Sequence, residues 1–378
     1  MYIKKFWIFI LFLSLCWNAF FFVSQGVFEL SRWKDKRIEE GHQSPLTDIS
    51  VFENSLYKGG MHIIETGSKP FTPKKMGGVI DNLNYNFKGY SKDELYTTSE
   101  MGYLMMATLE EAVKRDDKEA LDKIKKVFDK YVLNEELKNV DQCLYGIVAI
   151  GLYKATKEMK YRNYINAMAT WLNELYIPNV GILYRKGSSC NFVDGLGMYI
   201  PFLMEYSRFS HQSKYEDIAM KCFENYINDG VDHSTGIAYH GYSINSPKIK
   251  MGSANWGRGN AWMALAMVYL PIEKMPEGIA QICKKFQETM MSIYESQGEI
   301  RQFINDGLLD LSATIPILYS LDKDRCLKVD KLLYSKYLRE DILYFSSGPT
   351  TTINDYSPYR GPNMLSQAIM LKWLIECK

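Results

Sequence analysis

The chain has 378 residues, of which 47% are hydrophobic and 24% are charged, and its formal net charge is +1. This composition is ordinary for a globular protein and excludes a disordered chain, a collagen and a small disulfide-rich domain. With no overall basic field, we expect no nucleic-acid partner. Seven scattered cysteines without a C-x-x-C pair, and five histidines without an H-E-x-x-H motif, predict no metal site.

The N-terminus carries an apolar run over residues 6–24 that contains no charged residue and follows Lys4 and Lys5. A run of this length is enough for one helix to span the hydrocarbon core of a bilayer. We therefore expect residues 1–26 to be a transmembrane anchor, with a cleaved signal peptide as the alternative. Basic residues flank both ends of the run, so the orientation is open; we favour a body outside the cytoplasm, in a periplasm or at the cell surface.

The next segment, residues 27–92, is polar and irregular with several Gly and Pro residues, and we expect a linker and an N-terminal extension. Residues 93–378 form the main domain, in which predicted helices come in pairs. One member of each pair, such as residues 144–152, is apolar almost all round, and the other, such as residues 118–131, is amphipathic. A helix that is apolar on all sides is buried on all sides, so the pairs predict an inner and an outer layer.

The apolar helices recur with a loose period of about 50 residues, which is typical of a helical repeat. They begin near Ser99, Asp141, Asp194, Arg258, Asp310 and Pro362. This pattern predicts an all-α fold, an (α/α)6 barrel of six closed helical hairpins. An open solenoid of the HEAT type is the alternative, with shorter repeats and a polar concave face. Eleven helices are clear, so the twelfth either lies in residues 27–92 or is missing.

The inner helices of such a barrel run in the same direction, so their N-termini share one mouth. Polar side chains gather at these N-termini, namely Asp141, Asp194, Trp256, Arg258, Asn260, Asp310 and Arg360. Carboxylates, cations and an aromatic ring together suit a charged sugar. Asp is also a preferred N-cap residue, so each carboxylate has a purely structural alternative.

Five segments in this region resemble glycoside hydrolase families 88 and 105, in order and in spacing, over residues 97–378. Residues 255–262 read NWGRGNAW, close to the W-G/A-R-G-N-G-W signature of these families. The other four are Asp141 before an apolar helix, GILYRK at 181–186, VDGLGM with PFL at 193–203, and GIAYHGY at 236–242.

The resemblance implies a glycosidase of the unsaturated uronyl hydrolase type. Such an enzyme removes a 4,5-unsaturated uronic acid from the non-reducing end of oligosaccharides that polysaccharide lyases leave. It implies that Asp194 is the acid that protonates the C4=C5 double bond, that Asp141 is its partner, and that no metal or organic cofactor takes part. A carboxyl group can stay protonated near neutral pH if it is buried or lies near another carboxylate.

The resemblance also implies a set of substrate-binding residues, which are Lys186, His240, Trp256, Arg258, Asn260 and Trp262. The planar guanidinium of Arg258 suits a bidentate grip on the uronate carboxylate. Trp256 or Trp262 can stack on the sugar ring, although Trp262 fits core packing as well.

Several positions depart from the family pattern. Gly197 stands where an aromatic residue is usual, which we expect to enlarge the pocket beside the acid. Arg185 replaces a histidine, Phe192 stands near the usual tryptophan, and Ser243 replaces an aspartate. The departures keep open a catalytically inactive, membrane-tethered glycan-binding protein of polysaccharide assembly or processing. A membrane-tethered protein-binding solenoid is a third reading, but it would not explain the Trp-Arg motif.

Overall fold

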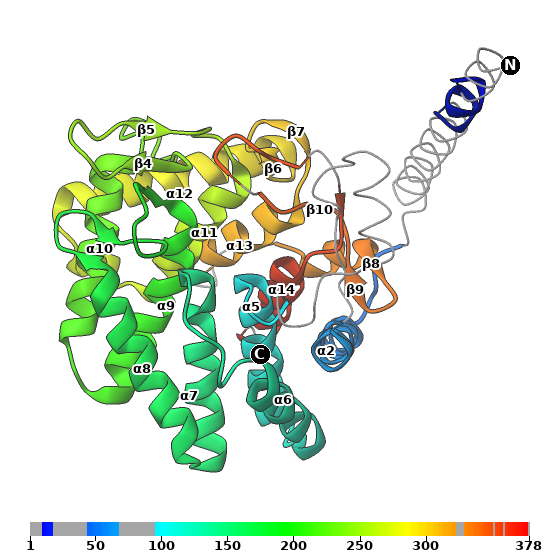
Figure 1. Ribbon diagram of the computed structural model, residues 1–378. Coiled ribbons are helices and arrows are strands. Elements are labelled where there is room, and N and C mark those ends of the chain that lie inside the picture. Colours follow the sequence, from blue (N-terminus) through cyan, green and yellow to red (C-terminus); the bar gives the residue numbers. More distant parts are fainter. Residues whose placement is uncertain are drawn as a thin grey trace, which may run out of the picture.

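The computed structural model describes residues 10–17, 44–67, 95–322, 329–350, 352–357 and 360–376. Its centre is a ring of inner helices (Figure 1), which are α5 (Ser99–Lys114), α7 (Leu144–Thr156), α9 (Val193–Ser210), α11 (Gly257–Tyr269), α13 (Leu311–Leu321) and α14 (Met364–Glu376). Each packs against the next in this order, and α14 packs back against α5. The ring is therefore closed, as an (α/α)6 barrel requires, and the open solenoid is excluded.

The inner helices are buried because they have no polar face. In α11 every residue from Gly257 to Met267 is buried. Such close packing needs small residues at some crossings. A Cβ atom on Gly197 of α9 would lie only 2.7 Å from the ring and 2.8 Å from the carbonyl oxygen of Trp262 on α11. The space beside Gly197 is thus filled by Trp262, and the expectation that this glycine enlarges the pocket is wrong.

The outer helices cover the ring with one apolar stripe each. They are α6 (Lys118–Tyr131), α8 (Met159–Leu175), α10 (Lys214–Gly230) and α12 (Glu277–Gln297). In α6 the buried residues Ala120, Ile124 and Phe128 recur at a spacing of four, while salt-bridged lysines lie outside. This is the pattern of a surface helix on a hydrophobic core.

A further outer helix, α2 (Ile49–Thr66), lies within the segment that was expected to be linker and extension. It packs against α14, α5 and α6, and Leu56 and Ile63 on its inner face are fully buried. The main domain therefore includes α2, and a boundary at residue 93 is too late. Of the two options for the missing helix, its origin in residues 27–92 is the one that the structure supports.

Between α13 and α14 the outer layer is irregular. In place of an α-helix, the described residues there form a 3₁₀ helix, η3 (Lys331–Tyr337), and the hairpin of β8 (Leu338–Arg339) and β9 (Ile342–Leu343). The hairpin contacts α2, so this side of the ring is also covered.

Short strands precede several inner helices and lie at the mouth formed by the helix N-termini (Figure 1). The pairs are β1 (Tyr176–Ile177) with β2 (Gly181–Ile182), β6 (Arg301–Phe303) with β7 (Asp306–Leu309), and β10 (Ser346–Ser347) with β11 (Arg360–Gly361). A three-stranded sheet joins β3 (Cys190–Phe192), β4 (Gly241–Ser243) and β5 (Lys250–Met251). All these pairings are antiparallel.

Of the expected anchor, only residues 10–17 are described, and they are helical. The remainder of the apolar run at 6–24 lies outside the described residues. Within the described part of the chain, no helix has both the length and the apolar character that crossing a membrane requires.

Candidate active site

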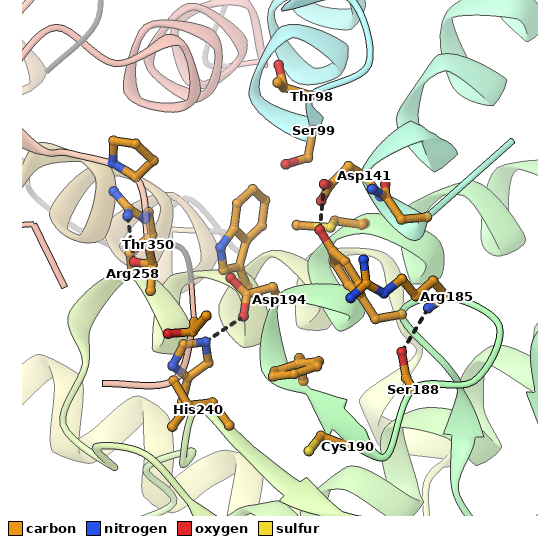
Figure 2. A pocket seen from close by; sticks show the side chains of 18 of the residues that line it. Thr98, Ser99, Asp141, Arg185, Ser188, Cys190, Asp194, His240, Arg258 and Thr350 are labelled. Atoms are coloured by element: carbon orange, nitrogen blue, oxygen red, sulfur yellow. Dashed lines mark hydrogen bonds and ion pairs between the residues drawn. The ribbon is translucent and has the colours of Figure 1, made fainter. Parts of the chain in front are cut away.

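A cavity of about 780 Å³ opens among the N-termini of the inner helices. Figure 2 shows Asp194 near its centre, with Asp141 and Arg185 on one side and Arg258 and Thr350 on the other. Of the predicted site residues, those that line the cavity are Asp141, Asp194, His240, Trp256, Arg258 and Trp262. The structure thus brings together residues from η1 (Val140–Cys143), α9, α11 and the loop before β4.

Neither catalytic candidate is a helix cap. Helix α9 begins after Phe192 without any side-chain cap, and Asp194 is its second residue. The turn η1 is capped by the side chain of Asn139, which accepts a hydrogen bond from the backbone N–H of Asp141 at 3.0 Å. Both carboxyl groups are therefore free of the structural role that Asp often has at a helix start.

Asp194 is a mostly buried acid whose side chain is 19% exposed. Burial raises its pKa above the ordinary value, and the negative charge of Glu100 adds to this effect. The neighbouring His240 and Arg258 act in the opposite direction, but burial is the larger cause. The group therefore retains its proton to a higher pH than an exposed aspartate does.

Asp141 lies beside Asp194 and receives a hydrogen bond from the hydroxyl of Tyr184 at 2.6 Å on Oδ2. Burial raises the pKa of Asp141 to about 7. The Tyr184 hydrogen bond lowers the pKa, and the negative charges of Glu100 and Asp194 raise it. Near neutral pH this carboxyl group can therefore either hold or release a proton.

Glu100 and Tyr184 are site residues that the sequence reasoning missed. Glu100 lies in the first turn of α5, after the cap Thr98, and it lines the cavity as a third acid. Its place at the start of the first inner helix, like those of Asp141 and Asp194, is a signal that could have identified it. Tyr184 lies inside the matched segment 181–186, next to Arg185 and Lys186, which the sequence analysis considered instead.

His240 is placed beside the acid by strand pairing. Phe192 on β3 lies opposite Gly241 on β4, and the backbone N–H of Val193 donates to the carbonyl of His240 at 3.0 Å. Nε2 of His240 consequently lies 3.5 Å from Oδ2 of Asp194. Burial lowers the pKa of His240, so the imidazole is neutral at physiological pH.

The aromatic side chains around His240 fix the plane of its ring. The ring centroid of Trp256 lies 4.4 Å from that of His240, and Phe192 meets it edge-on at 5.9 Å. Trp256 is only 1% exposed. Its contact with His240 shows that it packs against a polar member of the site as well as lining the cavity.

Arg258 is buried and makes many hydrogen bonds within the chain. Nη1 donates to the carbonyl and hydroxyl oxygens of Ser347 and to Oγ of Ser312, at 2.8, 3.0 and 3.3 Å. Nη2 donates to the carbonyl of Gly348 at 2.7 Å and to Thr350 Oγ1 at 3.2 Å. The terminal nitrogens expected to grip a carboxylate thus already hold the segment after β10 against the ring.

Asn260 and Lys186 are predicted binding residues that do not line the cavity. Asn260 is fully buried, and its side chain accepts from the backbone N–H of Ala238 at 2.9 Å and donates to the carbonyl of Trp256. It therefore ties the start of α11 to the chain that leads to His240. Lys186 is exposed on the loop between β2 and β3, and its neighbour Arg185 lines the cavity instead.

Asp310, at the start of α13, is a cap. Its carboxylate accepts hydrogen bonds from the backbone N–H of Ser312 at 2.9 Å and from the N–H of Ser347 at 3.0 Å. The positive charges of Arg258 and Arg360, together with hydroxyl hydrogen bonds, hold its pKa below the ordinary value despite complete burial. Neither Asp310 nor Arg360 lines the cavity.

The chemistry that these residues offer is acid–base chemistry on a polar substrate. Among the described residues, no group of three or more His, Cys, Asp or Glu side chains is arranged to hold a metal ion. Three carboxyl groups, a neutral imidazole and two arginines line the cavity. Such a fold and such a site are those of a glycoside hydrolase built on a helical barrel.

The model of Glycosyl Hydrolase Family 88 matches residues 85–331, which is more than half of the chain. The protein therefore belongs to glycosyl hydrolase family 88, and its class of enzyme is a glycosidase. No curated protein sequence matches the chain.

Solved structures with low sequence identity share the fold. A possible GH105 member from Salmonella enterica serovar Paratyphi A has a TM-score of 0.66 at 17% identity, covering 89% of this chain and 96% of that one. A possible GH105 member from Klebsiella pneumoniae has a TM-score of 0.65 at 16% identity, with coverages of 89% and 95%. Unsaturated glucuronyl hydrolase from Bacillus sp. GL1 has a TM-score of 0.63 at 14% identity, with coverages of 86% and 95%.

The raised pKa of Asp141 predicts a pH-dependent loss of stability. Between its ordinary pKa of 3.8 and its folded-state pKa of about 7, the folded protein holds a proton that the unfolded chain has released. The free energy of unfolding therefore falls as the pH rises through this window and levels off above it. Asp141→Asn keeps an acceptor for Tyr184 but has no carboxyl group to titrate, so it does not lose stability in this way. The melting temperature of the variant minus that of wild type should therefore be a few °C higher at pH 8 than at pH 5.

The matched control is Asp116→Asn, because the Asp116 side chain is exposed and its ion-pair partner Lys118 is exposed as well. Its melting temperature relative to wild type should not change with pH. Calorimetry of the three proteins at pH 5 and pH 8 makes the comparison. A shift for Asp141→Asn that is the same at both pH values would contradict the burial of a protonated acid.

Proposed function

We propose that the protein hydrolyses oligosaccharides that carry a 4,5-unsaturated uronic acid at the non-reducing end. The observation that carries this proposal is a pair of neighbouring carboxyl groups, Asp141 and Asp194, whose pKa values burial raises within the cavity of a family 88 glycosidase. An acid that remains protonated near neutral pH is what protonation of a vinyl ether requires. Support also comes from the likeness of the fold to unsaturated glucuronyl hydrolases.

The proposed reaction begins at the double bond and not at the anomeric carbon. Asp194 gives its proton to C4, the positive charge that develops at C5 is shared with the ring oxygen, and a water molecule adds to C5. The proton that this water releases returns to the carboxylate of Asp194. The hemiketal that results opens, the sugar rearranges, and the glycosidic bond is lost. This differs from the two-carboxylate displacement of most glycosidases.

Asp141 is the second carboxyl group of the proposed mechanism. With a pKa of about 7 and a hydrogen bond from Tyr184, it can accept a hydrogen bond from a sugar hydroxyl or hold a proton itself. The two carboxyl groups are close enough that a negative charge on Asp194 disfavours ionisation of Asp141.

The substitution Asp194→Asn tests the acid. Asparagine keeps the size and the hydrogen-bonding pattern but has no proton to give, so turnover should fall by about 10²–10⁴. Substrate binding should persist, because the shape of the cavity is unchanged. The absorbance of the double bond of a lyase-generated unsaturated disaccharide reports turnover, and wild-type rates should fall as the pH rises through the raised pKa of Asp194.

Two outcomes would change the proposal. Equal turnover by wild type and Asp194→Asn would remove this residue from the mechanism. Binding of the disaccharide by wild type without any loss of the double bond would instead favour the inactive glycan-binding protein.

The carboxylate of such a substrate needs a cation, and two arginines line the cavity. The terminal nitrogens of Arg258 donate to Ser347, Gly348 and Thr350. Arg185 is exposed on the loop between β2 and β3, and its guanidinium forms no ion pair among the described residues. We therefore expect Arg185 to supply the larger part of carboxylate recognition and Arg258 to brace the wall of the site.

Substitutions at the two arginines separate these roles. Arg185→Ala should raise KM for the acid substrate about tenfold. This is the effect of losing one charged hydrogen bond that solvent weakens because Arg185 is exposed. It should leave KM for the methyl ester unchanged, because the ester has no anion. Arg258→Lys should raise KM for the acid and for the methyl ester by the same factor. It should also lower the melting temperature, because Lys cannot make the several hydrogen bonds of the planar guanidinium group.

The control for charge alone is Lys186→Ala, which removes a cation from the same loop outside the cavity. It should leave KM for both substrates within about twofold, since distant surface charges are screened. An acid-specific rise in KM for Arg258→Lys, with no effect of Arg185→Ala, would restore Arg258 as the carboxylate clamp.

We also propose that the N-terminal apolar run attaches the protein to a membrane, with the glycosidase domain outside the cytoplasm. The support is the length of the uncharged run at residues 6–24. The full chain should fractionate with membranes, whereas a chain that begins at Ser44, and so keeps α2, should not and should retain its activity. Recovery of the intact full-length chain in the soluble fraction would contradict attachment.

A further inference from the structure

We propose that Tyr356 is a positioning residue that holds His240 as the tautomer with its proton on Nε2, so that this N–H faces Oδ2 of Asp194. Tyr356 does not line the cavity, and no segment of the family resemblance contains it. The catalytic consequence rests on the proposed function, because it assigns the acid proton of Asp194 to one oxygen. The tautomer itself can be measured without any substrate.

The hydroxyl group of Tyr356 lies between a backbone donor and His240. The oxygen of Tyr356 accepts from the backbone N–H of Ser253 at 3.2 Å, and it lies 3.2 Å from Nδ1 of His240. A phenol has one proton to donate, and a neutral imidazole has one N–H and one acceptor nitrogen. Acceptance from Ser253 leaves the phenolic proton available, and Nδ1 lies within its reach. In the proposed arrangement the phenol donates to Nδ1, and the imidazole proton lies on Nε2.

The charged and titratable groups that face His240 agree with a neutral ring. Asp194 lies at Nε2, 3.5 Å away, and attracts a proton, while the positive charge of Arg258 and burial both disfavour a second one. Tyr356 is the remaining titratable neighbour, and burial raises its pKa, so it remains a neutral donor. Nε2–H opposite Oδ2 is thus the arrangement that satisfies both groups.

Tyr356 is held firmly enough to fix a tautomer. Its ring packs against Trp256 at 5.3 Å and edge-on against Phe303 at 5.2 Å between centroids. The next residue, Ser357, accepts a hydrogen bond on its carbonyl from the buried side chain of Gln302 at 2.6 Å. The phenol is therefore anchored through its ring, its backbone and its hydroxyl group.

The consequence for catalysis lies in the two oxygens of Asp194. When Nε2–H occupies Oδ2, the transferable proton of the carboxyl group sits on Oδ1. The opposite tautomer would leave Nε2 as an acceptor, which would attract the acid proton away from the substrate. A fixed tautomer keeps the acid oriented for transfer, in the same way that a neighbouring group orients the imidazole in other acid–base sites.

The test is ¹⁵N spectroscopy of the full-length protein labelled in its histidines, with His240 assigned from a His240→Gln sample. We expect wild type to show a protonated Nε2 and an acceptor Nδ1. In Tyr356→Phe the Nδ1 signal should move to the position of an acceptor without a hydrogen bond, with signs of both tautomers. For turnover of the unsaturated disaccharide, kcat should fall about tenfold and KM should stay within about twofold.

The control is Tyr319→Phe, which also deletes a hydroxyl group that donates to an acceptor, here Glu376 at 2.8 Å, at a residue that does not line the cavity. It should lower the melting temperature and leave the His240 signals and kcat unchanged.

Three results would overturn the proposal. They are a wild-type His240 that is protonated on Nδ1 or on both nitrogens, a His240 spectrum that Tyr356→Phe does not alter, and an altered spectrum with unchanged kcat. The wild-type spectrum alone decides the first, even if Tyr356→Phe fails to fold. Absence of turnover by wild type would count against the proposed function, while the tautomer would still be read from the spectrum.

Discussion

The buried guanidinium of Arg258 is the interaction on which the site's C-terminal wall depends. It binds Ser312 on α13 and Ser347 after the ring's fifth inner helix, while Asp310 accepts from the same two serines and balances the charge. Tyr356 lies further along the same connection between β10 and β11, so the segment that Arg258 binds also leads to a residue in contact with His240.

The three aspartates at inner-helix starts show why position alone does not set acidity. The dipole of a helix N-terminus favours an ionised carboxylate by about 0.3–1 kcal/mol. Asp310 adds two arginines and several donors to this effect, and its pKa falls although it is fully buried. Asp194 and Asp141 have fewer donors, so burial dominates and their pKa values rise. The same place in the fold thus yields one structural anion and two acids.

The ring and most of the acid site could be predicted from the sequence, because apolar helices at regular intervals leave few alternatives. Helix α2 could not, because its Gly59-Gly60 pair is typical of a linker. In the structure a Cβ on Gly59 would lie 2.0 Å from the carbonyl of Asp341, so the glycine serves close packing. Tyr356 comes from a segment far from the Trp-Arg motif, and only the folded structure brings its hydroxyl group to His240.

The Trp-Arg-Asn motif illustrates how a substrate-binding assignment can conceal a positioning role. A motif fixes which residues are neighbours in the chain, but not which way each side chain points. Trp256 packs against His240. Arg258 binds the carbonyl of Gly348 just after β10, and Asn260 binds the backbone of Ala238, two residues before His240. Of the three, Trp256 contacts the imidazole directly, and the imidazole faces Asp194. Part of the motif therefore packs behind the cavity: Asn260 is fully buried, does not line the cavity, and binds the backbone that leads to His240.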